Sequence, residues 1–381
     1  MPIASLVKCA SYDEAEVSAA IERAVDLIGG AESIFERGEK ILVKINLLRA
    51  YQPEKRVTTH PAIVRAIIEL VRKAGAEPIV GDSPGEINTP SSFRRLARIT
   101  GIGPLCEEMG VKLVLFDGDM RKLESPSGKL FRFFDAAGIL QEVDGVVAAP
   151  VLKTHGLMKI TCAVKVLFGL LSGVHKLQYH VKVPSRRDFA DMLVDLYLAV
   201  KPRLAVVDAV IGMDGEGPAH GDPFSLGAII SAVDCLIADV AACRLIGIDP
   251  LSIYTTAAAA ARGLVDPEDL DLVGDPLESF RVDGFRLSKS DLEDRELPFA
   301  RRLFRNLSTA KPALKSAVSC TSCATCQRLC PARAIDLQSG KPSFDYEKCI
   351  RCYCCEELCP EGAIERRNHW LVRPLARRLG L

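Results

Sequence analysis

Several features that would place this chain in a broad class are missing from its sequence. Lys and Arg together number 49 and so do Asp and Glu, so no excess of basic charge indicates nucleic-acid binding. No apolar run is long enough to span a bilayer. The first residues, MPIASLVKCASYDE, show no basic segment followed by a long apolar core, so no signal peptide is predicted. We therefore expect a cytoplasmic protein that does not bind nucleic acid.

The sequence also lacks the motifs of the common nucleotide sites. No G-x-G-x-x-G fingerprint follows a predicted strand, and no glycine-rich loop carries a Walker lysine. One loop, GMDGEGPAHGDP (212–223), is dense in glycine and proline, so its backbone could approach a ligand closely. A standard dinucleotide site or P-loop is nevertheless not expected.

Cysteine is scarce over most of the chain and dense near its end. Of the 14 cysteines, nine fall between Cys320 and Cys359, and the others are scattered in apolar contexts. In a cytosolic chain, cysteines clustered at short fixed spacings indicate metal binding rather than disulfide bonds.

The clustered cysteines form a repeat. The pattern C-x-x-C-x-x-C-x-x-x-C-P-x-x-A-I occurs at 320–335 and again at 349–364, and it resembles a bacterial-type two-cluster ferredoxin over about 50 residues. In such proteins the fourth cysteine of each run ligates the other cluster. We therefore predict two [4Fe–4S] clusters, one on Cys320, Cys323, Cys326 and Cys359, and the other on Cys349, Cys352, Cys355 and Cys330. Zinc, which favours two separated C-x-x-C pairs, fits this repeat poorly.

One cysteine of the second run is surplus to this pattern. Cys354 breaks the spacing of the ligands. It is either a redox-active thiol or a small apolar residue that fills space beside the cluster, and we favour the second interpretation.

The rest of the chain alternates between strand-like and helix-like segments. The predicted strands are 41–48, 79–82, 112–117, 145–150, 203–210 and 227–232. The predicted helices are 6–27, a helix that opens at Pro61 and stops at Gly75, 160–171, 188–200 and 235–246. This alternation predicts an α/β domain with a mostly parallel sheet flanked by helices, followed by a small α+β ferredoxin-like two-cluster domain.

The composition also suggests where the domains end. We place the α/β domain at 1–284, a charged connector at 285–318, the two-cluster domain at 319–366 and a basic tail at 367–381. The tail carries leucines at helical spacing, which could rest on an anionic membrane surface. Pro374 interrupts that pattern, so we favour packing against the protein itself or a second subunit, and we do not expect membrane contact.

Polar residues gather where the predicted strands end, which is where α/β proteins bind ligands. Lys153, His155 and Lys165 follow the strand 145–150 and are the predicted catalytic residues. A buried Lys165 could donate a proton, although the side chain could equally reach the surface. Residues predicted to bind a cofactor at other strand ends or helix starts are Lys44, Asn46, His60, Asp82 and Asp208, and Asp208 could instead cap a loop.

These segments together resemble one family over nearly the whole chain. VKINLL with VTTHP, GAEPIVGDSPG, LKTHGLMKITCAVKVLFGL and GMDGEGPAHGDP are similar to segments of domain-of-unknown-function family 362, uncharacterised iron–sulfur proteins. The resemblance implies an α/β core that carries two [4Fe–4S] clusters. The resemblance implies little about which reaction, if any, the protein catalyses.

Three functions remain open from the sequence. The first is an oxidoreductase that passes electrons through the clusters to or from a substrate, or a second unidentified cofactor, in the α/β domain. The second is an electron carrier or adaptor whose large domain docks a partner enzyme. The third is a structural or sensing role for the clusters, which a single cluster would satisfy. The expected partners are a redox protein and an anionic small molecule, and a homo-oligomer is compatible with the sequence.

Overall fold

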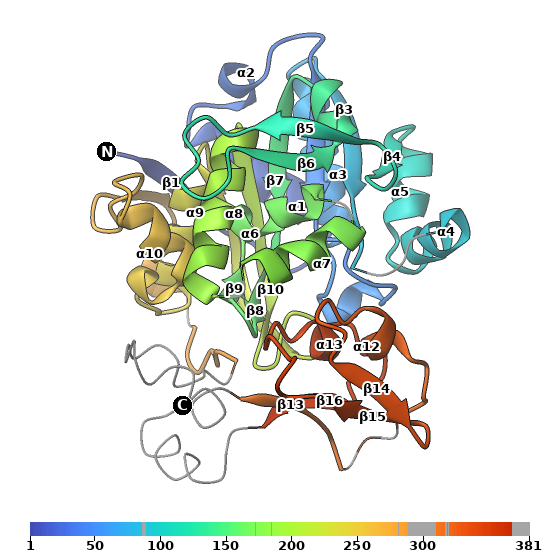
Figure 1. Cartoon of the computed structure of the whole chain (residues 1–381). Coiled ribbons are helices and arrows are strands. Elements are labelled where there is room, and N and C mark those ends of the chain that lie inside the picture. The colour runs from blue at the N-terminus through green and yellow to red at the C-terminus, as the bar shows by residue number, and fades with distance from the viewer. Residues whose placement is uncertain are drawn as a thin grey trace.

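The large part of the protein is an α/β domain against which the cysteine-rich module packs (Figure 1). The computed structural model describes residues 1–85, 89–171, 173–183, 185–280, 282–288, 310–316, 318 and 320–367, without the side chains of 173–175 and 177. The tail after Arg367, and with it the membrane alternative for that tail, lies outside the described residues. No helix in the described part of the chain is long and apolar enough to cross a membrane.

The α/β domain is built on one large mixed sheet. Its main path runs in the order β12–β1–β11–β10–β7–β2–β3–β4, with β8 paired to β10 and β9 paired to β8. The strands are β1 (Ile3–Lys8), β2 (Lys40–Ile45), β3 (Glu77–Asp82), β4 (Lys112–Leu115), β7 (Gly145–Ala149), β8 (Val151–His155), β9 (Lys159–Thr161), β10 (Leu204–Asp214), β11 (Asp222–Ala232) and β12 (Asp271–Gly274). Neighbours from β10 to β4 are parallel, whereas β11 is antiparallel to both β10 and β1.

Helices cover both faces of this sheet (Figure 1). The helices are α1 (Glu14–Asp26), α2 (Ala31–Ile34), α3 (Pro61–Lys73), α4 (Pro90–Ile99), α5 (Ile102–Glu108), α6 (Ala163–Val166), α7 (Gly173–Lys182), α8 (Arg186–Val200), α9 (Cys235–Leu245) and α10 (Tyr254–Ala260). Short 3₁₀ turns are η1 (Pro53–Lys55), η2 (Gly138–Gln141), η3 (Leu167–Leu170), η4 (Pro250–Ser252) and η5 (Leu277–Ser279), and a separate hairpin joins β5 (Met120–Glu124) to β6 (Phe133–Ala137).

Strand β2 illustrates how the sequence divides the core into two. All of its residues except Lys40 are buried, as expected of a strand covered on both faces. Ile41, Val43 and Ile45 pack with α1 and α3 in one core, whereas Leu42 packs in the core on the other face with α6, α8 and α9. Because side chains alternate across a strand, Lys44 lies on the same face as Leu42.

Most predicted elements are confirmed, and two are corrected. The helix predicted at 6–27 is wrong in its first part, because 3–8 forms β1 between β11 and β12, and the helix begins only at Glu14, after the N-cap Asp13. The predicted helix 160–171 is instead β9, α6 and η3. In both places the sheet offers a partner strand, and sheet pairing overrides the local helical pattern.

The cysteine-rich module contains two strand pairs and two short helices. Its elements are β13 (Lys311–Leu314), α12 (Thr325–Arg328), β14 (Ile335–Gln338), β15 (Lys341–Phe344), α13 (Cys354–Glu357) and β16 (Ile364–Arg367). Strand β13, which falls in the segment predicted to be a connector, pairs with β16, and β14 pairs with β15. The described part of the module thus supports the predicted α+β class.

Arg366 joins the module to the large domain. Its side chain is 2% exposed, and its Nε lies 3.0 Å from Glu356 Oε2 of α13. Its guanidinium also forms an ion pair with Glu216 and donates to the carbonyl of Gly156 at 3.3 Å. Glu216 belongs to the loop GMDGEGPAHGDP, so this loop contacts the module as well as approaching a pocket through Pro218. A second contact is the hydroxyl of Tyr51, which donates to the carbonyl of Pro360.

Replacing Arg366 should loosen the module. Arg366→Ala leaves Glu356 and Glu216 without their cation, and removing one partner of a buried ion pair costs about 3 kcal/mol or more. We expect faster amide hydrogen exchange in α13 and β16. The neighbouring Arg367→Ala is the control, because Arg367 pairs with Glu365 at an exposed site, where such pairs contribute at most about 1 kcal/mol. Equal exchange in both variants would contradict the proposed contact.

Candidate functional site

The structure brings the cysteines together in two groups of four. Burial raises the pKa of the Cys326 thiol, and the nearby Cys359, Cys320 and Cys323 raise it further. In the same way burial raises the pKa of Cys330, with further contributions from Cys352 and Cys349. Cys355 lies close to Cys352, Cys349 and Cys330. These two groups are the ligand sets predicted from the repeat.

The two cysteine loops have the same backbone conformation. Equivalent residues take left-handed φ values in each loop: Ser322 and Arg351 at 58° and 60°, and Ala324 and Tyr353 both at 59°. After the fourth cysteine of each run, the amide of Ala334 donates to Cys330 Sγ and the amide of Ala363 donates to Cys359 Sγ, both at 3.2 Å. The sequence repeat is therefore also a structural repeat.

The two groups fit the ligation of an iron–sulfur cluster. Cys320, Cys323, Cys326 and Cys359 line a common cavity with Ile364, and backbone N–H donors to ligand sulfurs are a feature that tunes such clusters. Ile335 and Ile364 pack beside the cysteines and limit the access of water. In the described part of the chain, no three His, Cys, Asp or Glu side chains converge as the ligands of a single metal ion would.

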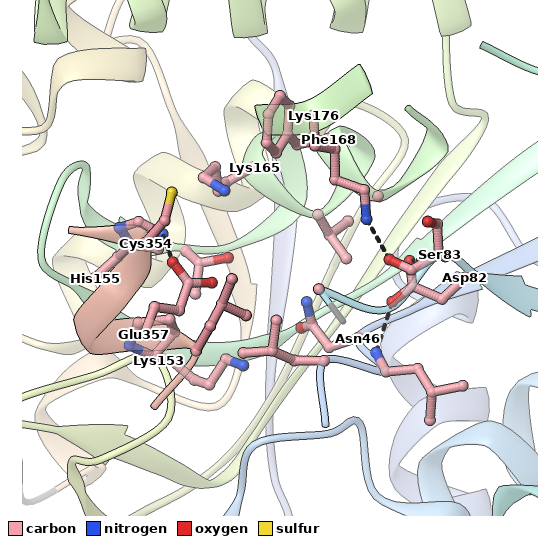
Figure 2. A pocket seen from close by; sticks show the side chains of 18 of the residues that line it. Asn46, Asp82, Ser83, Lys153, His155, Lys165, Phe168, Lys176, Cys354 and Glu357 are labelled. Carbon is pink, nitrogen blue, oxygen red and sulfur yellow. Dashed lines mark hydrogen bonds and ion pairs between the residues drawn. The ribbon is translucent and has the colours of Figure 1, made fainter. Parts of the chain in front are cut away.

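A pocket lies between the large domain and α13 of the module (Figure 2). It encloses a cavity of ≈ 110 Å³. Its lining residues come from strand ends, from η3 and α7, and from α13; those with polar side chains or a thiol are Lys44, Asn46, Asp82, Ser83, Lys153, His155, Thr161, Lys165, Lys176, His180, Cys354 and Glu357. The cavity therefore collects four lysines and two histidines but only two carboxylates.

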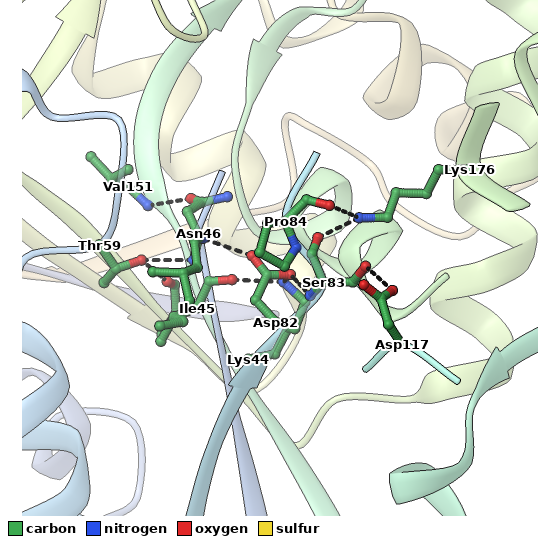
Figure 3. Close-up of polar contacts among 12 residues, drawn as sticks. Lys44, Ile45, Asn46, Thr59, Asp82, Ser83, Pro84, Asp117, Val151 and Lys176 are labelled. Atoms are coloured by element: carbon green, nitrogen blue, oxygen red, sulfur yellow. Dashed lines mark hydrogen bonds and ion pairs between the residues drawn. The ribbon is translucent and has the colours of Figure 1, made fainter. Parts of the chain in front are cut away.

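Lys44 and Asp82 form one wall of the pocket as a buried ion pair. Lys44 Nζ lies 2.8 Å from Asp82 Oδ1 and donates to the carbonyl of Ile45 at 2.6 Å (Figure 3). Burial lowers the pKa of Lys44, and the charge of Asp82 opposes that shift. The side chains meet directly under Gly169 of η3, where any Cβ would collide with them. Asn46 is held beside the pair, because its Oδ1 accepts the Val151 amide at 2.9 Å.

Lys153 and His155 project from β8 into the opposite wall. Lys153 is 1% exposed, and its Nζ donates to the carbonyl of Val57 at 2.7 Å. Burial lowers the pKa of Lys153 to about 7, and Glu357 opposes that shift. His155 Nδ1 accepts the amide of Leu157 at 3.0 Å, so its proton lies on Nε2, which is 3.8 Å from Glu357 Oε2. Burial holds the pKa of His155 well below its usual value, so the ring is neutral near pH 7.

Lys165 and Lys176 complete the pocket from the helical side. Lys176 donates to the carbonyl of Ser83. Lys165 lies 4.8 Å from the centre of the Phe168 ring, and within the described residues its Nζ has no hydrogen-bond or ion-pair partner. Burial lowers the pKa of both lysines, that of Lys176 to about 8. The sequence left open whether Lys165 is buried or reaches the surface. In the structure the residue is partly buried, which is intermediate between these two alternatives.

Two of the predicted site residues lie elsewhere. Asp208 Oδ1 accepts the hydroxyl of Tyr12 at 2.8 Å, and its Oδ2 accepts the amide of His60. His60 Nδ1 accepts the Ala62 amide at the start of α3, and its ring stacks on Tyr12 at 3.7 Å. His60 and Asp208 thus form a separate cluster with Tyr12 and do not line the pocket. Because side chains alternate along a strand, Asp208 lies on the same face of β10 as Val206 and Val210. That face of the sheet is opposite the one that carries Lys44.

Six polar or thiol residues that line the pocket were not among the predicted site residues: Ser83, Thr161, Lys176, His180, Cys354 and Glu357. Glu357 and Cys354 reach it from α13, and Ser83 follows Asp82 at the end of β3. Cys354, which we expected to fill space beside a cluster, is 4% exposed and packs with Leu329 and Leu358. Only the docking of the module onto the strand ends, about 200 residues away in sequence, brings Glu357 and Cys354 to the pocket. Nothing in the local sequence signals that contact.

The fold and the site define an α/β protein fused to an iron–sulfur module of the ferredoxin type. Residues 41–244 match the family described as Domain of unknown function (DUF362), and the chain belongs to this family. Residues 313–360 match the 4Fe-4S dicluster domain. The chain therefore carries at least one [4Fe–4S] cluster, which supports an iron–sulfur electron-carrier role.

Two known proteins are similar to this chain. The Thylakoid-associated protein sll1697 of Synechocystis sp. is 31% identical over 261 residues, which cover 68% of this chain and 79% of that protein. The apoprotein of the lactate racemase from Thermoanaerobacterium thermosaccharolyticum aligns with a TM-score of 0.42 at 15% identity. That alignment covers 65% of this chain and 57% of the racemase chain.

The buried histidines predict how the stability of the large domain depends on pH. His180 stacks on Phe189 at 4.7 Å, and burial lowers its pKa to about 3. The folded ring is neutral while the unfolded ring binds a proton below pH ~6.5, so stability should be lost as the pH falls from 6.5 toward 3. His180→Phe keeps the stack and removes the proton site. It should reduce the pH slope of the unfolding free energy by up to about 1.4 kcal/mol per pH unit.

Urea unfolding between pH 7.5 and 5.5, followed by the helical circular dichroism signal, measures this slope. Tyr179→Phe is the matched control, since burial raises the pKa of Tyr179 to about 12 and the residue does not titrate in this range. If His180→Phe and the parent protein showed the same slope, the neutral buried state of His180 would be refuted.

Proposed function

We propose that this protein is an iron–sulfur oxidoreductase that passes electrons through two [4Fe–4S] clusters to or from a molecule in the interdomain pocket. One observation carries the proposal. The short helix α13 contains Cys355, a member of the second cysteine group, and also supplies Cys354 and Glu357 to the pocket wall. A cluster held by that group would border the pocket, and electrons would need to cross only the wall formed by α13.

The symmetry of the module supports the proposal of two clusters. Both cysteine groups have four members, and both loops share the left-handed residues and the amide donor to the fourth sulfur. Because the two loops share this conformation, each of them is suited to hold one [4Fe–4S] cube. Cys323 is exposed, so the first group is the end at which a redox partner protein would exchange electrons.

The pocket residues divide into two roles. Lys153, His155 and Lys165 would bind the anionic part of the substrate and supply protons as electrons arrive. Lysine amines with pKa values lowered toward neutrality are suited to proton transfer, and His155 can donate a hydrogen bond only through Nε2. Lys44, Asn46 and Asp82 would hold the ligand from the other side. His60 and Asp208 contact Tyr12 outside the pocket, so we propose no role for them in binding the ligand.

The second candidate is an electron carrier whose large domain docks a partner enzyme. The exposure of Cys323 favours it, because an open cluster edge suits exchange between proteins. For either function we propose a cytoplasmic location, consistent with cysteines that form no disulfide in the described residues. The name of the Synechocystis relative associates that protein with thylakoids, so contact with a membrane surface is the competing location.

Reoxidation of the reduced protein separates the two functions. Protein purified without oxygen and reduced by a chemical donor should contain about eight iron atoms per chain. If it is an oxidoreductase, a fraction of small metabolites should restore its visible absorbance, and Lys153→Gln should slow that step by about 10-fold or more. A soluble one-electron dye, which reaches the exposed cluster directly, should reoxidise both forms at the same rate.

The carrier function predicts a different result. No small-molecule fraction would reoxidise the protein faster than buffer, while a ferredoxin-like protein would do so equally well with Lys153→Gln and His155→Asn. About four iron atoms per chain would refute the two-cluster assignment.

A further inference from the structure

Within the described residues, Lys165 is the one lysine of the interdomain pocket whose amine has no hydrogen-bond or ion-pair partner. Lys44 is bound to Asp82 and the Ile45 carbonyl, Lys153 donates to Val57, and Lys176 donates to Ser83. Lys165 Nζ has neither a hydrogen-bond nor an ion-pair partner among the described residues, and it lies 4.8 Å from the centre of the Phe168 ring. A cation removed from water without an acceptor is costly, so this amine is arranged for a negatively charged partner.

Glu357 is the nearest carboxylate from the module side. It opposes the burial-induced lowering of the pKa of both Lys165 and Lys153, so its charge acts on both amines. It pairs weakly, however, because its closest ion-pair contact among the described residues is His155 Nε2 at 3.8 Å, and that ring is neutral near pH 7. Its side chain is 23% exposed. Glu357 therefore supplies a distant negative charge that a bound anion could replace.

The cavity sets the size of that anion. A volume of ≈ 110 Å³ is well below the roughly 300 Å³ or more of pockets that enclose drug-sized ligands. Such a space cannot enclose a nicotinamide or flavin dinucleotide, whereas it can enclose inorganic phosphate or a short dicarboxylate. Figure 2 shows Lys153, Lys165 and Lys176 around this cavity, with Cys354 and Glu357 on one side and Asp82 and Ser83 on the other.

We propose that the interdomain pocket binds a small oxyanion directly on Lys165, in competition with the charge of Glu357, and that binding is linked to the reduction of the cluster held by Cys330, Cys349, Cys352 and Cys355. The anion site stands on the geometry of the pocket, and the linkage rests on the proposed function. An anion in the pocket adds negative charge near a cluster that gains negative charge on reduction. Anion binding should therefore lower the reduction potential of that cluster, and reduction should weaken anion binding by the same factor.

Calorimetric titration of the oxidised holoprotein with inorganic phosphate and with oxalate tests the site, and the two probes distinguish a tetrahedral from a planar anion. We expect at least one of them to bind. Lys165→Gln should weaken that binding by about 10-fold or more, the loss expected for a charge-assisted hydrogen bond. Glu357→Gln should tighten it, because the variant removes the competing charge.

Lys159→Gln is the matched control. Lys159 precedes Lys165 by six residues, lies over the Tyr254 ring at 5.2 Å and lines a different cavity. It should leave binding unchanged, with the same visible absorbance and circular dichroism in all variants. The site is overturned if neither anion binds, if Lys159→Gln weakens binding as much as Lys165→Gln, or if Glu357→Gln weakens it.

A potentiometric titration followed by electron paramagnetic resonance tests the linkage. The binding anion should lower the potential of one cluster in the parent protein and should not do so in Lys165→Gln. An unchanged potential with bound anion would overturn the linkage. This test is independent of turnover: protein that binds the anion but is reoxidised by no metabolite would refute the oxidoreductase function alone. Metabolite-driven reoxidation without anion binding would refute only the anion site on Lys165.

Discussion

The arrangement of this molecule depends on burying positive charge where the parallel strands end. Four lysine side chains reach one small cavity, and two of them, Lys44 and Lys153, are 1% exposed. Charges removed from water must be compensated locally. The protein does so with one close carboxylate, Asp82, with backbone carbonyls, and with Glu357 from a separate module. The excess of amines over carboxylates in the pocket is the basis on which we propose an anionic ligand.

The same constraint explains why the cysteine-rich module docks where it does. Glu357 and Leu358 meet the strand ends, while Arg366 binds Glu216 and Glu356 at the adjoining edge. Ion pairs of Arg366 thus hold the module at this edge. Leu358 approaches Gly85 so closely that a Cβ on residue 85 would collide with it. The module therefore supplies Cys354, Glu357 and Leu358 to the wall of the lysine pocket. The proposed path of electrons follows from that geometry.

Much of this could be predicted from the sequence, for identifiable reasons. The two groups of cysteines follow from a repeat whose spacing resembles that of two-cluster ferredoxins, and the family resemblance of the large domain is confirmed. Lys44, Asp82 and Lys153 meet because the carboxyl ends of parallel strands share one edge, and Lys165 joins them from α6. His60 and Asp208 end up elsewhere because the register of β10 turns Asp208 to the other face, which the sequence does not reveal. Glu357 could not be found, since its contact depends on docking.

The central claim is that a cluster borders the lysine pocket. Diffraction at the iron absorption edge, from crystals of protein purified and grown without oxygen, tests it most directly. The account predicts two separate four-iron anomalous peaks, with the one held by Cys330, Cys349, Cys352 and Cys355 next to α13 and the cavity lined by Lys165. A single peak in the module, or a second cluster separated from the pocket by the bulk of the module, would contradict it.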